Sequence, residues 1–146
     1  MASIRKEILI EARPEEVWEA VRDFGAVQQR LVPGFVVDTR LDGDVRVLTF
    51  ANGMVAREVL VDIDEETRRL VYAIVQGRPT HYNASVQVFA EDGGRSRLAW
   101  IVDLLPNDLA GPIGSMMEQG ATAMKQTLEG RTALGPPRLP RDVMRD

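Results

Sequence analysis

The chain has no cysteine and only one histidine among its 146 residues. The lack of cysteine excludes disulfides, thiolate nucleophiles and zinc or iron–sulfur sites with cysteine ligands. A single histidine excludes a multi-histidine metal site, and a Ser-His-Asp triad would have to use His81. We therefore expect neither a metal ion nor a cofactor.

Long apolar runs and basic clusters are also missing. No apolar run approaches the ~20 residues of a membrane span, and the charges from Arg5 to Glu7 interrupt any signal-peptide core near the N-terminus. The net charge is −4 and only 5% of the residues are aromatic, so the chain offers neither a basic patch nor a stacking platform for nucleic acid. The sequence predicts a cytoplasmic protein without a transmembrane segment or a nucleic-acid partner.

The length and composition indicate one domain. A chain of 146 residues can bury a full core, and 45% hydrophobic with 27% charged residues is ordinary for a globular protein. We expect the domain to cover residues 1–130. Residues 131–146 form a tail rich in Pro and Arg without apolar periodicity, which predicts an extended or disordered segment. The composition is compatible with a homodimer.

The segment 106–130 is typical of an amphipathic helix. At about 100° per residue its apolar residues fall in one arc of roughly 140°. Pro112 suits the first turn, and Gly130 suits a cap beyond the last turn. The residues in the arc are Ile113, Met116, Met117, Gly120, Ala121, Met124, Thr127 and Leu128.

The apolar face of this predicted helix has three methionines, a glycine and an alanine, but no aromatic residue. Methionine adapts to irregular neighbours, and small residues leave room. Two interpretations follow from the face alone. The helix either packs flat on a sheet as an ordinary core helix, or it lines a deformable cavity.

The rest of the chain predicts one more strand, two short helices and then a series of strands. Residues 4–11 read as a strand, Pro14 opens a helix, and 26–31 form a second short helix. Six further strands are predicted at 35–41, 45–50, 54–64, 68–76, 80–90 and 96–105. This order predicts an α+β fold with a seven-stranded antiparallel sheet and one long helix to cover it.

Four stretches resemble the START-like superfamily, also called SRPBCC, and in particular its polyketide cyclase/dehydrase and lipid-transport type. They are PEEVWEAVRDFGAVQQRLVPG (14–34), REVLVDIDEETRRLVYAIVQG (57–77), THYNASVQV (80–88) and LAWIVDLLP (98–106). The resemblance implies the helix-grip fold, in which the sheet curves around the C-terminal helix and two short helices follow the first strand. It also implies a cavity between sheet and helix for an apolar or amphipathic small molecule.

Several positions match cavity residues of the superfamily. Glu58 matches a cavity carboxylate of its receptors, and Tyr82 matches a cavity tyrosine, with Ala84 where a receptor has a hydroxyl. The ligand-binding set that we expect is Glu58, Leu60, Tyr82, Ala84, Met116, Met117, Gly120 and Met124. Two departures argue against a gated hormone receptor: the hairpin at 51–53 is short, and the strand 35–41 lacks the lysine that pairs with the hormone's carboxylate.

The role of Glu58 has three interpretations. It shares a strand face with Ala56 and Leu60, so an inward orientation would make it a ligand anchor or acid–base group. A structural ion pair and a solvated position at the cavity rim are the other two interpretations. Arg46 and Arg57 are the candidate partners, although Arg57 adjoins Glu58 and faces the other way.

Other polar residues carry weaker signals. Alternation over 80–88 places His81 opposite Tyr82, on the solvent face. The faces of Asp103 and Tyr72 stay open, because both faces of their strands are apolar. The aspartate pairs 42/44 and 62/64 have the spacing of metal ligands but lie in turns, where solvated aspartate is common.

The leading hypothesis is a small-molecule-binding protein with an apolar cavity in which Glu58 and Tyr82 orient the ligand. The alternative is an enzyme of the polyketide cyclase/aromatase type that uses Glu58 and Tyr82 for proton transfer. A third hypothesis is a lipid or quinone chaperone that docks on a partner through the 131–146 tail and an exposed apolar strand face. A binding role is preferred over catalysis, because no evident base has a pKa near neutrality apart from a Glu58 perturbed by burial.

Overall fold

The computed structural model describes residues 1–133, which form one antiparallel sheet, one long helix and several short helical segments. The strands are β1 (Ala2–Ile10), β2 (Val36–Asp42), β3 (Val45–Phe50), β4 (Val55–Asp64), β5 (Arg69–Ile74), β6 (His81–Ala90) and β7 (Ser96–Leu105). The helices are α1 (Pro14–Arg22), η1 (Phe24–Ala26), α2 (Val27–Arg30), η2 (Asp92–Gly94), η3 (Asn107–Leu109) and α3 (Ala110–Ala133). The predicted tail lies mostly outside the described residues.

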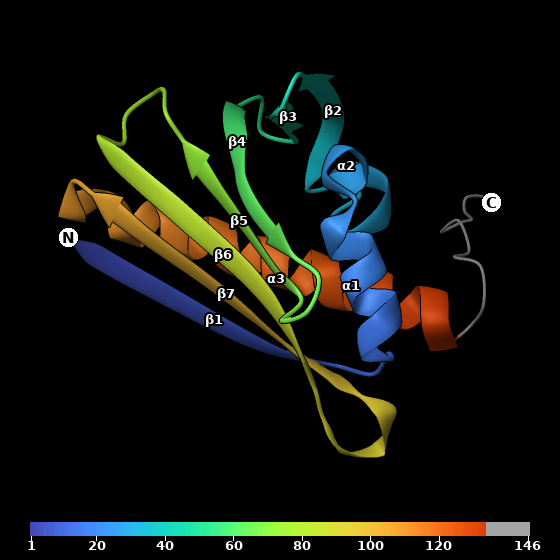
Figure 1. The fold of residues 1–146 in the computed structure, drawn as a ribbon. Helices are drawn as coiled ribbons and strands as arrows, with labels where there is room; N and C mark the ends of the chain where they lie inside the picture. The colour runs from blue at the N-terminus through green and yellow to red at the C-terminus, as the bar shows by residue number, and fades with distance from the viewer. Residues whose placement is uncertain (134–146) are drawn as a thin grey trace.

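The sheet has the order β1-β7-β6-β5-β4-β3-β2, and every neighbouring pair is antiparallel. Strands β2 to β7 form a meander, and β1 returns to pair with β7, with Ile4 opposite Val102. The consecutive strands β1 and β2 are therefore the two edges, and α1, η1 and α2 connect them (Figure 1). The predicted helix-grip fold is confirmed.

The structure assigns the strand faces that the sequence left open. In β7 the inward set is Leu98, Trp100, Val102 and Leu104, all buried. Asp103 therefore lies on the outer face. In β5 Tyr72 is buried and faces inward with Leu70, and in β6 Tyr82 faces inward while His81 is exposed, as predicted.

The long helix α3 runs along one face of the sheet (Figure 1). Its buried residues are Met117, Gly120, Ala121, Met124 and Leu128, which confirms the predicted apolar face. Gly130 does not cap the helix, because α3 continues to Ala133. A glycine inside a helix costs only about 1 kcal/mol relative to alanine, and the residues that follow are able to continue the helix.

Polar contacts hold α3 to β1, the edge strand beside β7. They are Lys6 Nζ to Glu118 Oε2 at 3.0 Å, Lys125 Nζ to the Leu9 carbonyl at 2.5 Å, and the Glu11 amide to Glu129 Oε2 at 2.9 Å. Within the described residues, every side-chain hydrogen bond from α3 to a strand or its flanking residue goes to this side. The face toward β2–β5 is left to apolar side chains.

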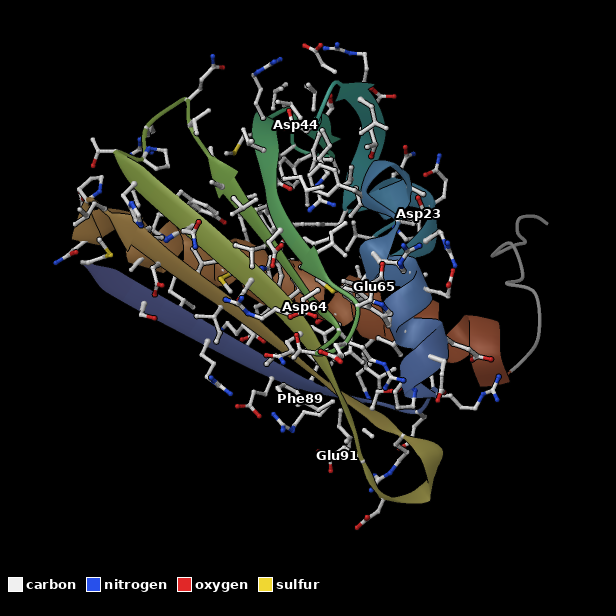
Figure 2. All side chains as sticks on the ribbon, viewed as in Figure 1. Asp23, Asp44, Asp64, Glu65, Phe89 and Glu91 are labelled. Atoms are coloured by element: carbon white, nitrogen blue, oxygen red, sulfur yellow. The ribbon has the colours of Figure 1, made fainter. Side chains whose placement is uncertain are left out.

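The turn between β4 and β5 is held to α1. Figure 2 shows Glu65 at this turn beside the helix. Trp18 Nε1 donates to Glu65 Oε1 at 2.7 Å, and Arg22 Nη2 donates to Glu65 Oε2 at 2.6 Å. Hydrogen bonds from Arg22 and Trp18 lower the pKa of Glu65. Asp64 accepts the amide of Glu66 at 3.0 Å, the role expected of a turn aspartate.

Candidate functional site

A cavity of about 460 Å³ lies between the inner face of the sheet, α2 and the part of α3 from Pro112 to Met124. Its walls are mainly apolar. Among the residues that contribute are Leu31, Leu48, Ile74, Val86, Trp100 and Ile113. The cavity exists because α3 is held at the β1 edge, so the helix stands off the strands at the other side of the sheet. A volume of this size falls within the range of small-molecule sites.

The exposed residues of the cavity wall gather at one end. Met54 and Val55 follow the β3–β4 turn and are 51% and 60% exposed. Gln76, Gly77 and Arg78 come from the loop between β5 and β6 and are exposed as well. This end is therefore the opening, and it combines apolar side chains with one exposed guanidinium.

Five of the eight residues that the sequence predicted for the ligand site lie on the cavity wall. They are Glu58, Tyr82, Met116, Met117 and Met124. The other three, Leu60, Ala84 and Gly120, are not part of the wall. The structure thus brings the carboxylate, the phenol and the methionine face to one space.

Neighbouring side chains explain why the three remaining residues lie away from the cavity. Ala84 sits directly between Tyr72 and Val102 in the sheet register. At Gly120 a Cβ would come within 3.2 Å of the Trp100 ring, so that ring fills the space beside the glycine. Leu60 packs against the core next to a bulge in β4. Gly120 thus lets Trp100 approach the helix.

Glu58 and Arg46 form a buried ion pair on the cavity wall. Arg46 Nε donates to Glu58 Oε1 at 2.8 Å, and each residue is 5% exposed. They are the only fully buried charged residues in the described chain. The ion-pair interpretation of Glu58 therefore describes the structure, with Arg46 as the partner. Arg57 faces outward and contacts Asp42 at 3.3 Å.

Aromatic rings enclose the Arg46 guanidinium. Its Cζ lies 4.1 Å from the centre of the Phe24 ring and 5.1 Å from that of Tyr72. Arg46 Nη1 also donates to the Phe24 carbonyl at 3.3 Å. Cation–π contacts strengthen when the cation is desolvated. The Arg46 guanidinium is thus held in one position by the Glu58 carboxylate and by the rings of Phe24 and Tyr72.

Two buried tyrosines face the same region. The Tyr72 hydroxyl accepts a hydrogen bond from Trp100 Nε1 at 3.1 Å. Burial, and then the negative charge of Glu58, raise the pKa of both Tyr72 and Tyr82 above that of free tyrosine. Both phenols therefore stay protonated and can donate hydrogen bonds throughout the neutral range.

The tyrosine titration gives a direct test. Tyr72 and Tyr82 are the only two tyrosines in the chain, so the ultraviolet absorbance of phenolate reports on them alone. In the native protein we expect little phenolate at about pH 10, where unfolded tyrosine is half ionised. Because the pKa of each tyrosine is higher in the folded than in the unfolded state, the two protonated phenols contribute to the free energy of unfolding in full below about pH 10. This contribution is lost as the pH rises further.

The matching measurement is the same titration in urea, where both phenols should ionise near their ordinary pKa. The unfolding free energy should fall with increasing alkalinity above that value. If the tyrosines of the native protein were half ionised at the same pH as those of the unfolded chain, the burial of both phenols would be contradicted.

Residues 72 and 100 were not assigned to the cavity from sequence, because both faces of their strands are apolar. His81 is exposed and is not part of the cavity wall.

Within residues 1–133, no group of three or more His, Asp or Glu could hold a metal ion. The same residues contain no helix that is long and apolar enough to cross a membrane.

The fold is similar to several solved structures. The protein XoxI from Bacillus cereus matches with a TM-score of 0.79 at 22% identity, over 88% of this chain and 96% of that one. A protein from Thermobifida fusca matches with a TM-score of 0.73 at 25% identity, over 94% and 98%. Norcoclaurine synthase from Thalictrum flavum, in complex with dopamine and hydroxybenzaldehyde, matches with a TM-score of 0.58 at 17% identity, over 83% and 84%.

The sequence comparison agrees with the fold. No curated protein sequence is significantly similar to the chain. The sequence profile of the family described as "Polyketide cyclase / dehydrase and lipid transport" matches residues 1–132. The match spans every strand and nearly all of α3, including the whole cavity wall. The chain therefore belongs to the polyketide cyclase/dehydrase and lipid-transport family, within the START-like superfamily that its sequence resembles.

Proposed function

We propose that the chain binds an apolar or amphipathic small molecule in the cavity between the sheet and α3. The observation that carries this proposal is an apolar cavity of about 460 Å³ whose inner wall holds a fixed polar group, the Arg46–Glu58 pair. Apolar walls would supply most of the affinity, at about 25 cal/mol per Å² of ligand surface removed from water. The buried polar groups would orient the ligand.

The methionine face of α3 suits such a role. Met116, Met117 and Met124 all lie on the cavity wall. Their unbranched side chains can adjust to ligands of different outline. The fold can also hold ring compounds, since the norcoclaurine synthase structure contains two of them, although at 17% identity that likeness supports only the capacity of the fold.

Binding is favoured over catalysis by the state of the polar groups. A general acid or base works best when its pKa lies near the working pH. The pKa of Tyr82 is raised away from neutrality, and Glu58 is engaged by Arg46. A cyclase-type reaction that uses these two residues remains the second candidate, supported by the family description. The chaperone hypothesis rests on an exposed apolar strand face and on the 131–146 tail, of which residues 134–146 lie outside the described part.

Native mass spectrometry of the freshly purified protein tests the proposal. We expect a population heavier than the apoprotein, which loses the mass of a small molecule on collisional activation. We also expect Nile red, an uncharged fused-ring dye, to bind at one site per chain and to be displaced by organic extracts of the expressing cells. A protein that carries no small molecule and does not bind the dye would contradict the proposal.

A further inference from the structure

The polar atoms that face the cavity are only partly hydrogen-bonded. Glu58 Oε1 accepts from Arg46, but Glu58 Oε2 has no hydrogen-bond partner within residues 1–133. Tyr82, 8% exposed and on the cavity wall, makes no hydrogen bond in the described chain. Tyr72 accepts from Trp100 and has its own proton left to donate. The wall therefore offers one carboxylate oxygen and two phenol donors to a ligand.

The buried part of the cavity wall carries no net charge. Arg46 and Glu58 are paired at 2.8 Å and cancel each other. Arg78 is the only other charged residue of the described wall, and it lies at the exposed opening, where solvent and salt screen it. An anionic ligand group placed beside Glu58 would lose its hydration without gaining an unpaired cation. A cationic group would likewise face Arg46.

An uncharged hydroxyl group fits the same atoms. It can donate to Glu58 Oε2 while its oxygen accepts from a phenol, so a single ligand group uses both kinds of unpartnered atom. The phenols remain donors because burial and Glu58 hold their protons in place. A bound ligand without such a group would cover these cavity-facing polar atoms and leave them unpaired, which weakens binding.

The shape of the adjacent wall favours a flat ring. Trp100 and Tyr72 lie on the sheet side, and Phe35 and Phe50 form an edge-to-face pair with ring centres 5.3 Å apart. Aromatic surfaces bind other rings by offset or edge contacts. Together with the polar corner, these surfaces define what can occupy the site.

We propose that the cavity selects uncharged, hydroxyl-bearing ring compounds and rejects ring carboxylates, with the Arg46–Glu58 pair as the discriminating element. The inference rests on the proposed binding function and specifies its ligand class. It assigns Glu58 a direct role in specificity: the carboxylate accepts a hydrogen bond from the ligand's hydroxyl group and at the same time neutralises Arg46.

A matched pair of probes tests this proposal. β-Naphthol and β-naphthoate share one ring system and differ in the hydroxyl and carboxylate groups. Titrated at neutral pH by calorimetry, β-naphthol should bind at least about tenfold more tightly than β-naphthoate. In Glu58→Gln the side-chain amide can still accept from Arg46, but the negative charge is gone. Arg46 then becomes available to an anion, and the preference for β-naphthol should shrink or reverse.

Glu66→Gln is the control. Glu66 is exposed at the β4–β5 turn, so this substitution removes the same charge at a position away from the cavity. This variant should keep the preference of the unmodified protein. Equal binding of the two probes to the unmodified protein, or an unchanged preference in Glu58→Gln, would overturn the ligand class and leave the binding function standing. Failure of both probes and of Nile red to bind would contradict the binding function itself.

Discussion

Replacing Arg46 by methionine is expected to lower the free energy of unfolding by about 3–5 kcal/mol. The change leaves the Glu58 carboxylate buried at 5% exposure without its partner at 2.8 Å. It also removes the cation from between the Phe24 and Tyr72 rings and deletes the hydrogen bond to the Phe24 carbonyl. Urea unfolding monitored by tryptophan fluorescence measures the loss.

Two further variants make this result specific. Arg57→Met removes the exposed contact with Asp42 on β2, two strands away in the sheet, and its effect should stay within about 1 kcal/mol. The double change Arg46→Met with Glu58→Leu should recover most of the stability, because a buried pair can be replaced by apolar residues with little loss. If Arg46→Met were as mild as Arg57→Met, the buried pair would not be a structural element.

Replacing Ala56 by tryptophan is expected to abolish ligand binding, with a loss of at least about 100-fold in affinity. Ala56 faces inward on β4, opposite Leu48, and is part of the cavity wall. An indole at this position would occupy the space that the ligand needs. The fold should tolerate it, because the ring enters an existing cavity and buries apolar surface there.

The control for the filled cavity is Ala73→Trp, on the outer face of β5. It makes the same change in the same sheet, but on the side away from the cavity. Nile red and β-naphthol titrations should give unchanged affinity for Ala73→Trp and no measurable binding for Ala56→Trp. Retained binding in Ala56→Trp would mean that the ligand site lies elsewhere.

Much of the fold could be predicted because local signals in this chain agree with one another. Short turns with glycine at positive φ, such as Gly43 and Gly53, separate strands of regular length. The alternation in β6 and the helical arc in α3 each identify one buried face without tertiary information. These signals, added to the resemblance, were enough for the sheet, the helix and five residues of the cavity wall.

The parts that could not be predicted depend on contacts across strands. Strand β7 is apolar on both faces, so periodicity does not say whether Trp100 or Ile101 faces inward. The β6–β7 register decides this, because Val86 lies directly opposite Trp100 and paired residues share one face of the sheet. The Arg46–Glu58 pair was one of three predicted alternatives for Glu58, and the structure places the two residues opposite each other in the β3–β4 hairpin. The enclosure of Arg46 by Phe24 depends on η1, which no local pattern places.

The one-sided attachment of α3 bears on how this family diversifies. The salt bridge and hydrogen bonds that hold the helix all lie along β1, while the cavity side carries only apolar side chains within the described residues. Substitutions at Met116, Met117 or Met124 can therefore reshape the interior while the polar contacts that attach the helix to β1 stay in place. The polar attachment of the helix and the residues of the proposed ligand site thus lie on two sides of one helix, so the site residues can change while this attachment is kept.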